Sequence, residues 1–252
     1  MKRIILILCI AVFSVWFANG AWAEGYAIQF VGDAAQHVEA KDSASLDING
    51  KEFTMEAWVY PTELGADLII VNKESSYEMG LGQGVLRYAI MAPTWAWWGQ
   101  GVVPLNEWSH VAVTYDGTET VGWINGAKAN SVKDNNGNIV PSGDPFNIGW
   151  RPWDTNFPFI GIIDEVRISK TVRYTQEFDV PDMAFENDEN TVALYHLDEG
   201  EGDSTEDDSG EGNHAELIGG PEWVESTAPF DVLAVNPGGK LAALWGAVKQ
   251  RE

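Results

Sequence analysis

Cysteine is almost absent from this chain of 252 residues. The single cysteine, Cys9, lies in an apolar stretch near the N-terminus. The rest of the chain therefore has no disulfide, no thiolate ligand for a metal and no cysteine nucleophile. A stable fold must then come from a large core or from a bound cation.

Basic residues are also scarce, because 15 lysines and arginines stand against 38 aspartates and glutamates, a formal net charge of −23. Repulsion from phosphate argues against a nucleic-acid partner, and anionic lipid is disfavoured in the same way. Neutral glycans, cationic partners and divalent cations stay compatible with this charge. Many of the carboxylates would serve only to keep the protein soluble.

Amphipathic helical patterns are lacking between residues 24 and 225, which excludes parallel α/β topologies. Instead, large apolar residues alternate with small or polar ones in short runs separated by Gly, Pro, Asn and Asp, as in half-buried strands. The expected strands are Tyr26 to Phe30, His37 to Ala40, Phe53 to Tyr60, Leu68 to Asn72, Tyr77 to Leu81, Val85 to Met91, Trp108 to Tyr115, Thr120 to Ile124, Phe146 to Gly149 and Ile160 to Ser169.

The first 23 residues have the features of a secretory signal peptide. Met1-Lys2-Arg3 is basic, residues 4–17 are nearly all apolar, and Ala21-Trp22-Ala23 is a small-x-small cleavage site. The apolar run is shorter than the roughly 20 residues of a spanning helix. We therefore expect a signal helix over 1–23, no membrane span after its removal, and a secreted, extracellular or cell-surface protein, with the periplasm also open.

Several sequence blocks, in order, resemble those of laminin-G-like jelly-roll domains of the bacterial secreted type. They are Phe53-Thr-Met-Glu-Ala-Trp-Val59, Leu105-Asn-Glu-Trp-Ser-His-Val-Ala-Val-Thr-Tyr-Asp-Gly117, Ile124-Asn-Gly126 and Gly161-Ile-Ile-Asp-Glu-Val-Arg-Ile168. The resemblance implies an all-β fold, a concanavalin A-like two-sheet jelly-roll β-sandwich. It also implies that the pieces Thr191 to Leu197 and His214 to Ile218 form a late hairpin, 191–219, that completes a domain spanning 24–225.

The same resemblance implies a calcium ion at the rim of the sandwich. Calcium takes six to eight hard oxygens from carboxylates, carbonyls and water. Asp164 matches the acidic position of the family, Asp33 lies in the first turn, and Asp208 belongs to the acidic loop of the late hairpin. The alternative is that Asp33 and Asp208 only form Asx turns.

Tryptophan is abundant, with twelve in the chain. Trp58, Trp108 and Trp123 fall within strand patterns and are expected in the core. Five others lie in loop-like stretches, where flat indoles could stack on sugar rings: Trp95, Trp97, Trp98, Trp150 and Trp153. The alternative is that these indoles pack on the sandwich, as large aromatic side chains usually do.

Catalysis is not expected. Glucanases that share this sandwich need paired carboxylates facing one cleft, whereas Asp164 and Glu165 are neighbours in a strand and point to opposite faces. His110 and His196 also lie in strand patterns and are interpreted as structural.

The residues favour an exported, non-catalytic binding module, with carbohydrate or glycoconjugate recognition as the main hypothesis. A structural or adhesion module that binds proteins is the alternative, and a glycoside-active enzyme is the third. The tail, 226–252, places Leu241, Leu244, Trp245 and Val248 on one face of a short helix, Lys240 to Lys249. That face would dock on the domain itself or on a sorting or surface partner.

Overall fold

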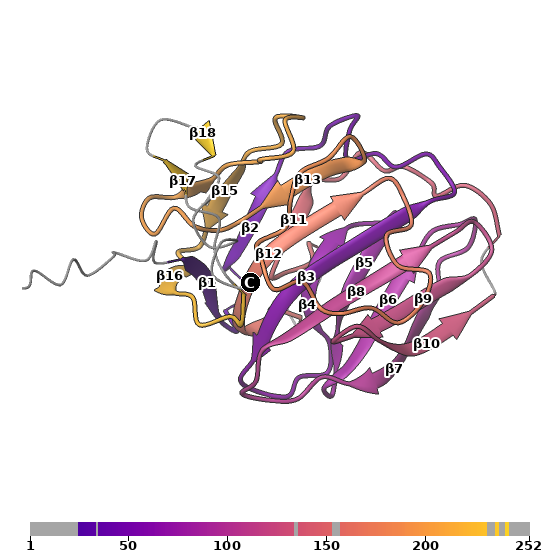
Figure 1. Ribbon diagram of the computed structural model, residues 1–252, viewed down its shortest axis with the longest axis horizontal. Helices are drawn as coiled ribbons and strands as arrows, with labels where there is room; N and C mark the ends of the chain where they lie inside the picture. The colour runs from indigo at the N-terminus through magenta and orange to yellow at the C-terminus, as the bar shows by residue number, and fades with distance from the viewer. Residues whose placement is uncertain are drawn as a thin grey trace, which may run out of the picture.

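The computed structural model describes residues 25–33, 35–133, 136–152 and 157–230, together with the backbone of 235–236 and 240–241. Within these residues the fold is all-β, and two sheets pack face to face (Figure 1). The fold class expected from the sequence is therefore confirmed. The signal segment, 1–23, lies outside the described residues.

Sheet A has eight strands in the order β10-β9-β8-β3-β12-β1-β16, with β13 also paired to β12. Its strands are β1 (Tyr26–Val31), β3 (Phe53–Pro61), β8 (Ser109–Tyr115), β9 (Thr120–Ile124), β10 (Ala127–Val132), β12 (Ile160–Ser169), β13 (Thr191–Tyr195) and β16 (Glu222–Glu225).

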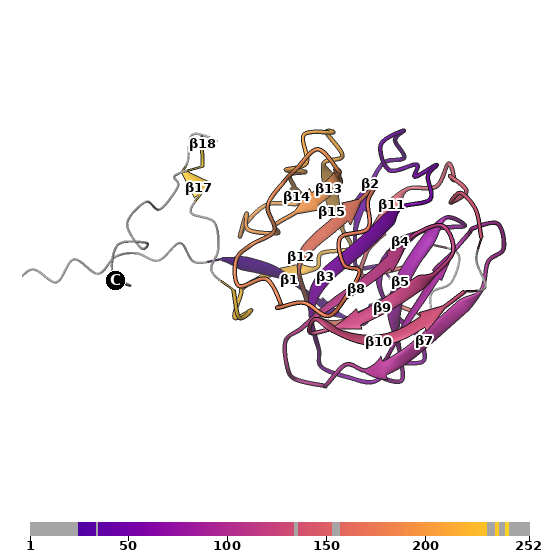
Figure 2. The same ribbon diagram turned by 45° about the vertical axis from the view of Figure 1, so that its right-hand side comes forward.

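Sheet B also has eight strands, in the order β14-β15-β2-β11-β4-β5-β6-β7. They are β2 (His37–Ala40), β4 (Leu68–Lys73), β5 (Tyr77–Gly82), β6 (Val85–Ile90), β7 (Trp97–Val102), β11 (Phe146–Ile148), β14 (Ser204–Thr205) and β15 (Ala215–Ile218). The turned view shows β7 beside β10, so the last strands of the two sheets lie together on one side of the sandwich (Figure 2).

The main core lies between the sheets and follows the alternation of each strand. In β3, Phe53, Met55 and Val59 face this core. The other side chains of the strand, Glu56 and Trp58 among them, point to the outer side of sheet A. They are buried as well, so this outer side must itself be covered.

The cover is the segment between β12 and β13, residues 170–190, which crosses over sheet A (Figure 1). Phe185 packs with Trp58 and Leu194 in a second apolar cluster, and the half-buried Trp108 borders it. Trp123 is buried against Phe178 of the same segment. The three tryptophans expected in the core thus lie in this outer layer, not between the sheets.

The late strands differ from the expected hairpin. β13 pairs with β12 in sheet A, whereas β15 pairs with β2 in sheet B. The two pieces therefore lie in different sheets, and the acidic loop between them crosses from one layer to the other. β16 then returns to sheet A and pairs with β1, next to the start of the described chain.

The tail is described only in part. β17 (Val235–Asn236) pairs with β18 (Lys240–Leu241), so the first two residues of the expected helix belong to a short strand pair. Residues 242–252 lie outside the described part. No helix within the described residues is long and apolar enough to cross a membrane.

Candidate functional site

The outer face of sheet B carries the side chains that β5, β6 and β7 turn away from the core. In β6, Leu86, Tyr88 and Ile90 are core residues, so Arg87 and Ala89 point outward. Register then places Gly80 and Gly99 on either side of Arg87 in the neighbouring strands. Unlike the part of sheet A under the segment 170–190, this part of sheet B has outward side chains that reach solvent, Arg87 among them.

Glycines shape the surface around Arg87. A Cβ atom at Gly99 would come within 2.8 Å of Arg87 Cγ, and a Cβ at Gly82 would collide with Arg87 Cδ. The aliphatic part of Arg87 therefore lies flat on the sheet in space that larger residues would fill. Because glycine inside a strand weakens it, such positions often mark a close approach by another group.

The guanidinium of Arg87 pairs with Asp67, which precedes β4, and lies 5.2 Å from the ring centroid of Trp97. Trp95 meets Trp97 edge to face, with ring centroids 6.0 Å apart. We call Arg87, Asp67, Trp95 and Trp97 the Arg87 platform. Its pair stays open to solvent, with 34% of the Arg87 side chain and 24% of the Asp67 side chain exposed.

The Arg87 platform combines three recognition chemistries. Arginine offers up to five N–H donors, and a carboxylate offers acceptors only. Within the described residues, only Nη1 of Arg87 has a hydrogen-bond partner, and Asp67 uses only Oδ1. Free donors and a free acceptor thus lie beside a flat aromatic surface, as a ligand with an apolar face and hydroxyl groups requires.

The other expected ligand-binding tryptophans lie apart from the platform. Trp98 follows Trp97 in β7, so it points to the opposite side and packs on the core. Trp97 and Trp98 are thus strand residues, not loop residues. Trp150 packs on His37, with ring centroids 4.5 Å apart and the ring planes tilted by 34°. Trp153 lies outside the described residues.

A row of buried polar side chains separates Trp150 from the platform. Asn147, Asn72 and Glu78 are neighbours in register across β11, β4 and β5, and none of them is exposed. One oxygen of each has no hydrogen-bond partner. Arg151, from the loop after β11, reaches Glu78 Oε1 at 3.5 Å.

Burial raises the pKa of Glu78 to about 8, against the lowering effect of Arg151. A carboxyl that holds its proton at neutral pH is often a general acid. Glu78 is fully buried, however, so it does not reach a sugar on the surface. Its raised pKa reports the cover over this part of the sheet.

Asp164, from β12 of sheet A, and Asp208, from the loop between β14 and β15, belong to one acidic cluster. β12 changes its partner from β1 to β13 at Asp164 and Glu165, and Glu165 has a φ of +48° at the bulge. Glu165 accepts a bond from Phe185 N and contacts His196 Nδ1 at 2.6 Å. Asp208 lies 3.6 Å from the other nitrogen of His196.

Both side-chain oxygens of Asp164 already have hydrogen-bond partners. Asp164 accepts hydrogen bonds from Ser226 Oγ at 2.5 Å and from Glu165 N. Burial, and next the nearby Glu165, raise the pKa of Asp164 well above its ordinary value. Burial also raises the pKa of Asp198, to about 6. Through Ser226 and Tyr26 N, Asp164 and Asp198 bond strand ends together.

Asp33 lies at the other end of β1. Its Oδ1 accepts a bond from the backbone of residue 35, which is an Asx turn. Register pairs Val31 with Ile160 and Ile28 with Ile163, so the last residue of β1 already lies roughly 13 Å of strand from the position opposite Asp164, and Asp33 follows it in the turn. Among the described residues no group of three or more acidic, histidine or cysteine side chains fits a metal ion. Calcium binding stays a prediction, and these three aspartates do not form one site.

His110 belongs to a buried network on sheet A. Glu56 Oε2 accepts from Tyr174 at 2.7 Å and contacts His110 Nε2 at 3.0 Å, while Oε1 receives Arg167. Burial opposes ionisation of Glu56, but Arg167, His110 and Tyr174 outweigh it and hold its pKa at about 2. The segment 170–190 seals this network from solvent.

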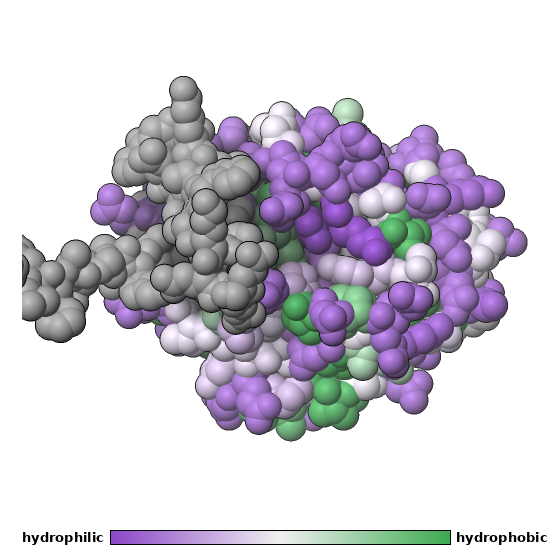
Figure 3. All heavy atoms as spheres, in the orientation of Figure 1, coloured by the Kyte–Doolittle hydropathy of each residue, from purple (hydrophilic) through white to green (hydrophobic). Residues whose placement is uncertain are grey.

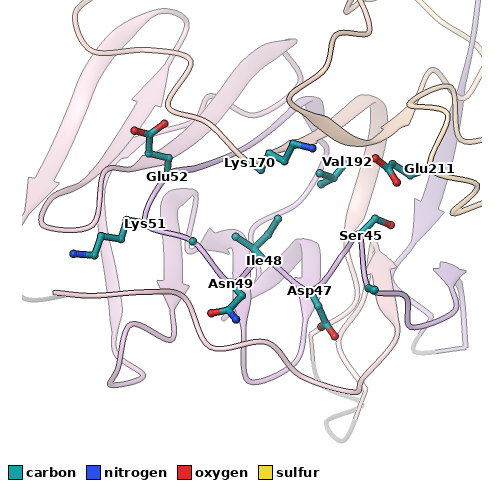
Figure 4. Close-up of a pocket in the computed structure, with 11 residues that line it drawn as sticks. Ser45, Asp47, Ile48, Asn49, Lys51, Glu52, Lys170, Val192 and Glu211 are labelled. Atoms are coloured by element: carbon teal, nitrogen blue, oxygen red, sulfur yellow. The ribbon is translucent and has the colours of Figure 1, made fainter.

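An open pocket lies elsewhere, along the loop before β3 (Figure 4). Ile48 lies near its centre, and Lys51 points away from the side where Lys170 and Glu211 lie. The charged groups therefore do not converge on one ligand position. The face shown in Figure 3 is mainly hydrophilic, with apolar residues in small separate groups.

The fold and its solvent-facing sheet define a lectin-like β-sandwich. The comparison with known families then places it. Residues 32–178, more than half of the chain, match a laminin-G family model described as the concanavalin A-like lectin/glucanases superfamily. The chain belongs to this superfamily, as the resemblance in the sequence indicated.

One solved structure supports the same fold. A candidate carbohydrate-binding protein of Bacteroides ovatus superposes with a TM-score of 0.67 at 21% identity, covering 82% of this chain and 62% of that one. This chain thus spans less than two thirds of that protein. The heptameric SAP-like pentraxin of Limulus polyphemus gives a TM-score of 0.48 at 13% identity, over 61% of this chain and 79% of the other. A comparison with curated protein sequences gives no match.

Arg87 and Asp67 were missed by the sequence analysis. The signal was present as glycines at alternate positions of adjacent strands, Gly80, Gly82 and Gly99. Reading it requires the pairing of three strands, because only register shows that these glycines surround one arginine.

Proposed function

We propose that the protein is an exported, non-catalytic module that binds neutral glycans at the Arg87 platform. One observation supports this most: a preorganised arginine–aspartate pair lies open to solvent against an indole. Sugar rings present an apolar face to stack on aromatic rings, and their hydroxyl groups both donate and accept hydrogen bonds.

The charge of the site favours neutral sugars over acidic ones. Arg87 is compensated by Asp67, so no uncompensated positive charge attracts a carboxylate or sulfate. The net charge of −23 adds repulsion against any polyanion. A glycoprotein would be bound through its neutral glycan part.

The location outside the cell rests on the N-terminal signal pattern, and extracellular or cell-surface glycans are the ligands it implies. A docking or sorting role of the tail stays a proposal with its own test, truncation after Ala234. The alternative is an adhesion module that binds a protein partner. It differs from the proposal because it requires no sugar to bind at Trp97.

The test is a glycan array of neutral oligosaccharides with the chain lacking residues 1–23. Trp97→Ala should weaken the binding that the array detects by about tenfold or more, because a central aromatic contact is lost. Trp108→Ala, which removes a half-buried indole on the far side of sheet A, is the matched control and should bind normally. The proposal fails if no neutral glycan binds, or if both variants bind equally.

A further inference from the structure

The surface beyond Arg87 continues along β6 and β7 toward the turn between β5 and β6. Val85 and Val102 pair there in register. Four residues of β7, Gly99 to Val102, lie opposite three of β6, Val85 to Arg87, and Gly101 has a φ of +86°. Such a bulge re-aims the side chains next to it.

The bulge leaves Val102 71% exposed, which is the largest exposure among the large apolar side chains of the described residues. Leu64 is 53% exposed and lies at the same turn, since its Cδ2 is 3.0 Å from where a Cβ of Gly84 would be. We call Leu64, Val85 and Val102 the aliphatic end. Exposed apolar groups that continue a polar recognition surface often mark a binding site.

The aliphatic end and the indoles lie at opposite ends of one strip. Trp97 and Val102 are five residues apart in β7, which is roughly 17 Å of strand. Asp67 and Leu64 come from the same loop, which borders the strip along its length. The strip therefore presents aromatic, polar and aliphatic surface in sequence.

We propose that the ligand is an extended chain of about three or more sugar units, which runs along β6 and β7 from Trp97 to Val102. This inference rests on the proposed function. A single terminal sugar would occupy only the Arg87 platform and would leave the aliphatic end exposed to solvent. In a longer chain, the apolar faces of further sugar rings cover the aliphatic end. Because Asp67 compensates the charge of Arg87, the platform favours an uncharged ligand.

The experiment measures dissociation constants by calorimetry for oligomers of one to six units from neutral glucose, xylose, arabinose, mannose and galactose series. For the wild type, affinity should rise with length and then level off at about four units. Val102→Asp should weaken the longer oligomers about fivefold or more and leave the shortest binder unchanged, because a charge is placed against an apolar sugar face. Val31→Asp is the matched control, since Val31 is 61% exposed at the end of β1 in sheet A.

The outcomes separate the two proposals. If a single sugar binds as tightly as the hexamer and Trp97→Ala abolishes that binding, the extended-chain inference is overturned and the proposed function stands. If Val102→Asp and Val31→Asp behave alike at every length, the aliphatic end takes no part and the inference is also overturned. If no oligomer of any series binds, both proposals fall.

Discussion

Each sheet carries an arginine–carboxylate pair and an aromatic ring on its outer face, and only the cover differs. In sheet A, Arg167 lies 2.8 Å from Glu56 and 4.4 Å from the ring centroid of Phe185, under the segment 170–190. In sheet B, Arg87 has Asp67 and Trp97 in the same relation, but the described part of the chain leaves this pair 34% and 24% exposed.

The same side chains therefore have opposite uses. A buried ion pair cannot meet a ligand, and every donor and acceptor around it must be matched inside the protein. An exposed pair contributes little to folding, typically below about 1 kcal/mol, but its free donors and acceptors stay available. The covered face stabilises the fold, and the open face is suited to recognition.

The largest effect should follow from breaking the covered pair. Glu56→Ala leaves the charge of Arg167 buried and unpaired, which costs about 3–5 kcal/mol of unfolding free energy. Urea unfolding would measure it, with the exposed Glu63→Ala as the control, expected within about 0.5 kcal/mol. A loss below about 1 kcal/mol would show that water reaches the network and that sheet A is not sealed.

A smaller effect should separate two adjacent tryptophans of the open face. Trp98→Ala opens a cavity against the core and should cost roughly 2–4 kcal/mol, somewhat less than a fully buried aromatic. Trp97→Ala should cost under about 1 kcal/mol yet weaken sugar binding by about tenfold or more. Thermal melts and glycan binding on both single variants test this. Equal losses of stability would mean that Trp97 is packed and not presented.

Glu78, a buried residue of β5 near the exposed platform, should make the free energy of unfolding depend on pH. The pKa of Glu78 is about 8 in the folded protein against an ordinary 4.5, so the folded state holds a proton that the unfolded chain releases. The contribution of Glu78 to the free energy of unfolding therefore falls as pH rises from about 4.5 to 8. Glu78→Gln, which stays neutral, should gain about 2 kcal/mol on the wild type between pH 6 and pH 8. Parallel stability curves for the two proteins would refute the shift.

The sequence predicts which side chains lie on the outer face of sheet A, but not what covers that face. Alternation predicts the strand Phe53 to Tyr60, and the period of two in a strand puts Glu56 and Trp58 on the side opposite Phe53. Alternation does not say what covers a face. The segment 170–190 has no strand pattern, so its place over sheet A could not be predicted from local sequence.

The candidate site was harder for a related reason. A run rich in tryptophan and glycine, Trp95 to Gly101, was interpreted as a loop, whereas Trp97–Val102 is β7. Pairing with β6 overrides the weak strand propensity of its glycines. The roles of Arg87 and Asp67 depend on contacts between strands that only the folded register creates, while the superfamily follows from blocks of local sequence.

The smallest effect concerns calcium at the seam where β12 leaves β1 and joins β13. The sequence predicts a rim ion held by Asp164, but both carboxylate oxygens of Asp164 already accept hydrogen bonds, from Ser226 and from Glu165 N. A site of about millimolar affinity would add only about 0.4 kcal/mol in millimolar calcium, or roughly 1 °C in melting temperature. We therefore expect melts in chelator and in calcium to differ by no more than this. A rise of several degrees that Asp164→Ala removes and Asp33→Ala keeps would instead show that calcium displaces these hydrogen bonds and organises the seam.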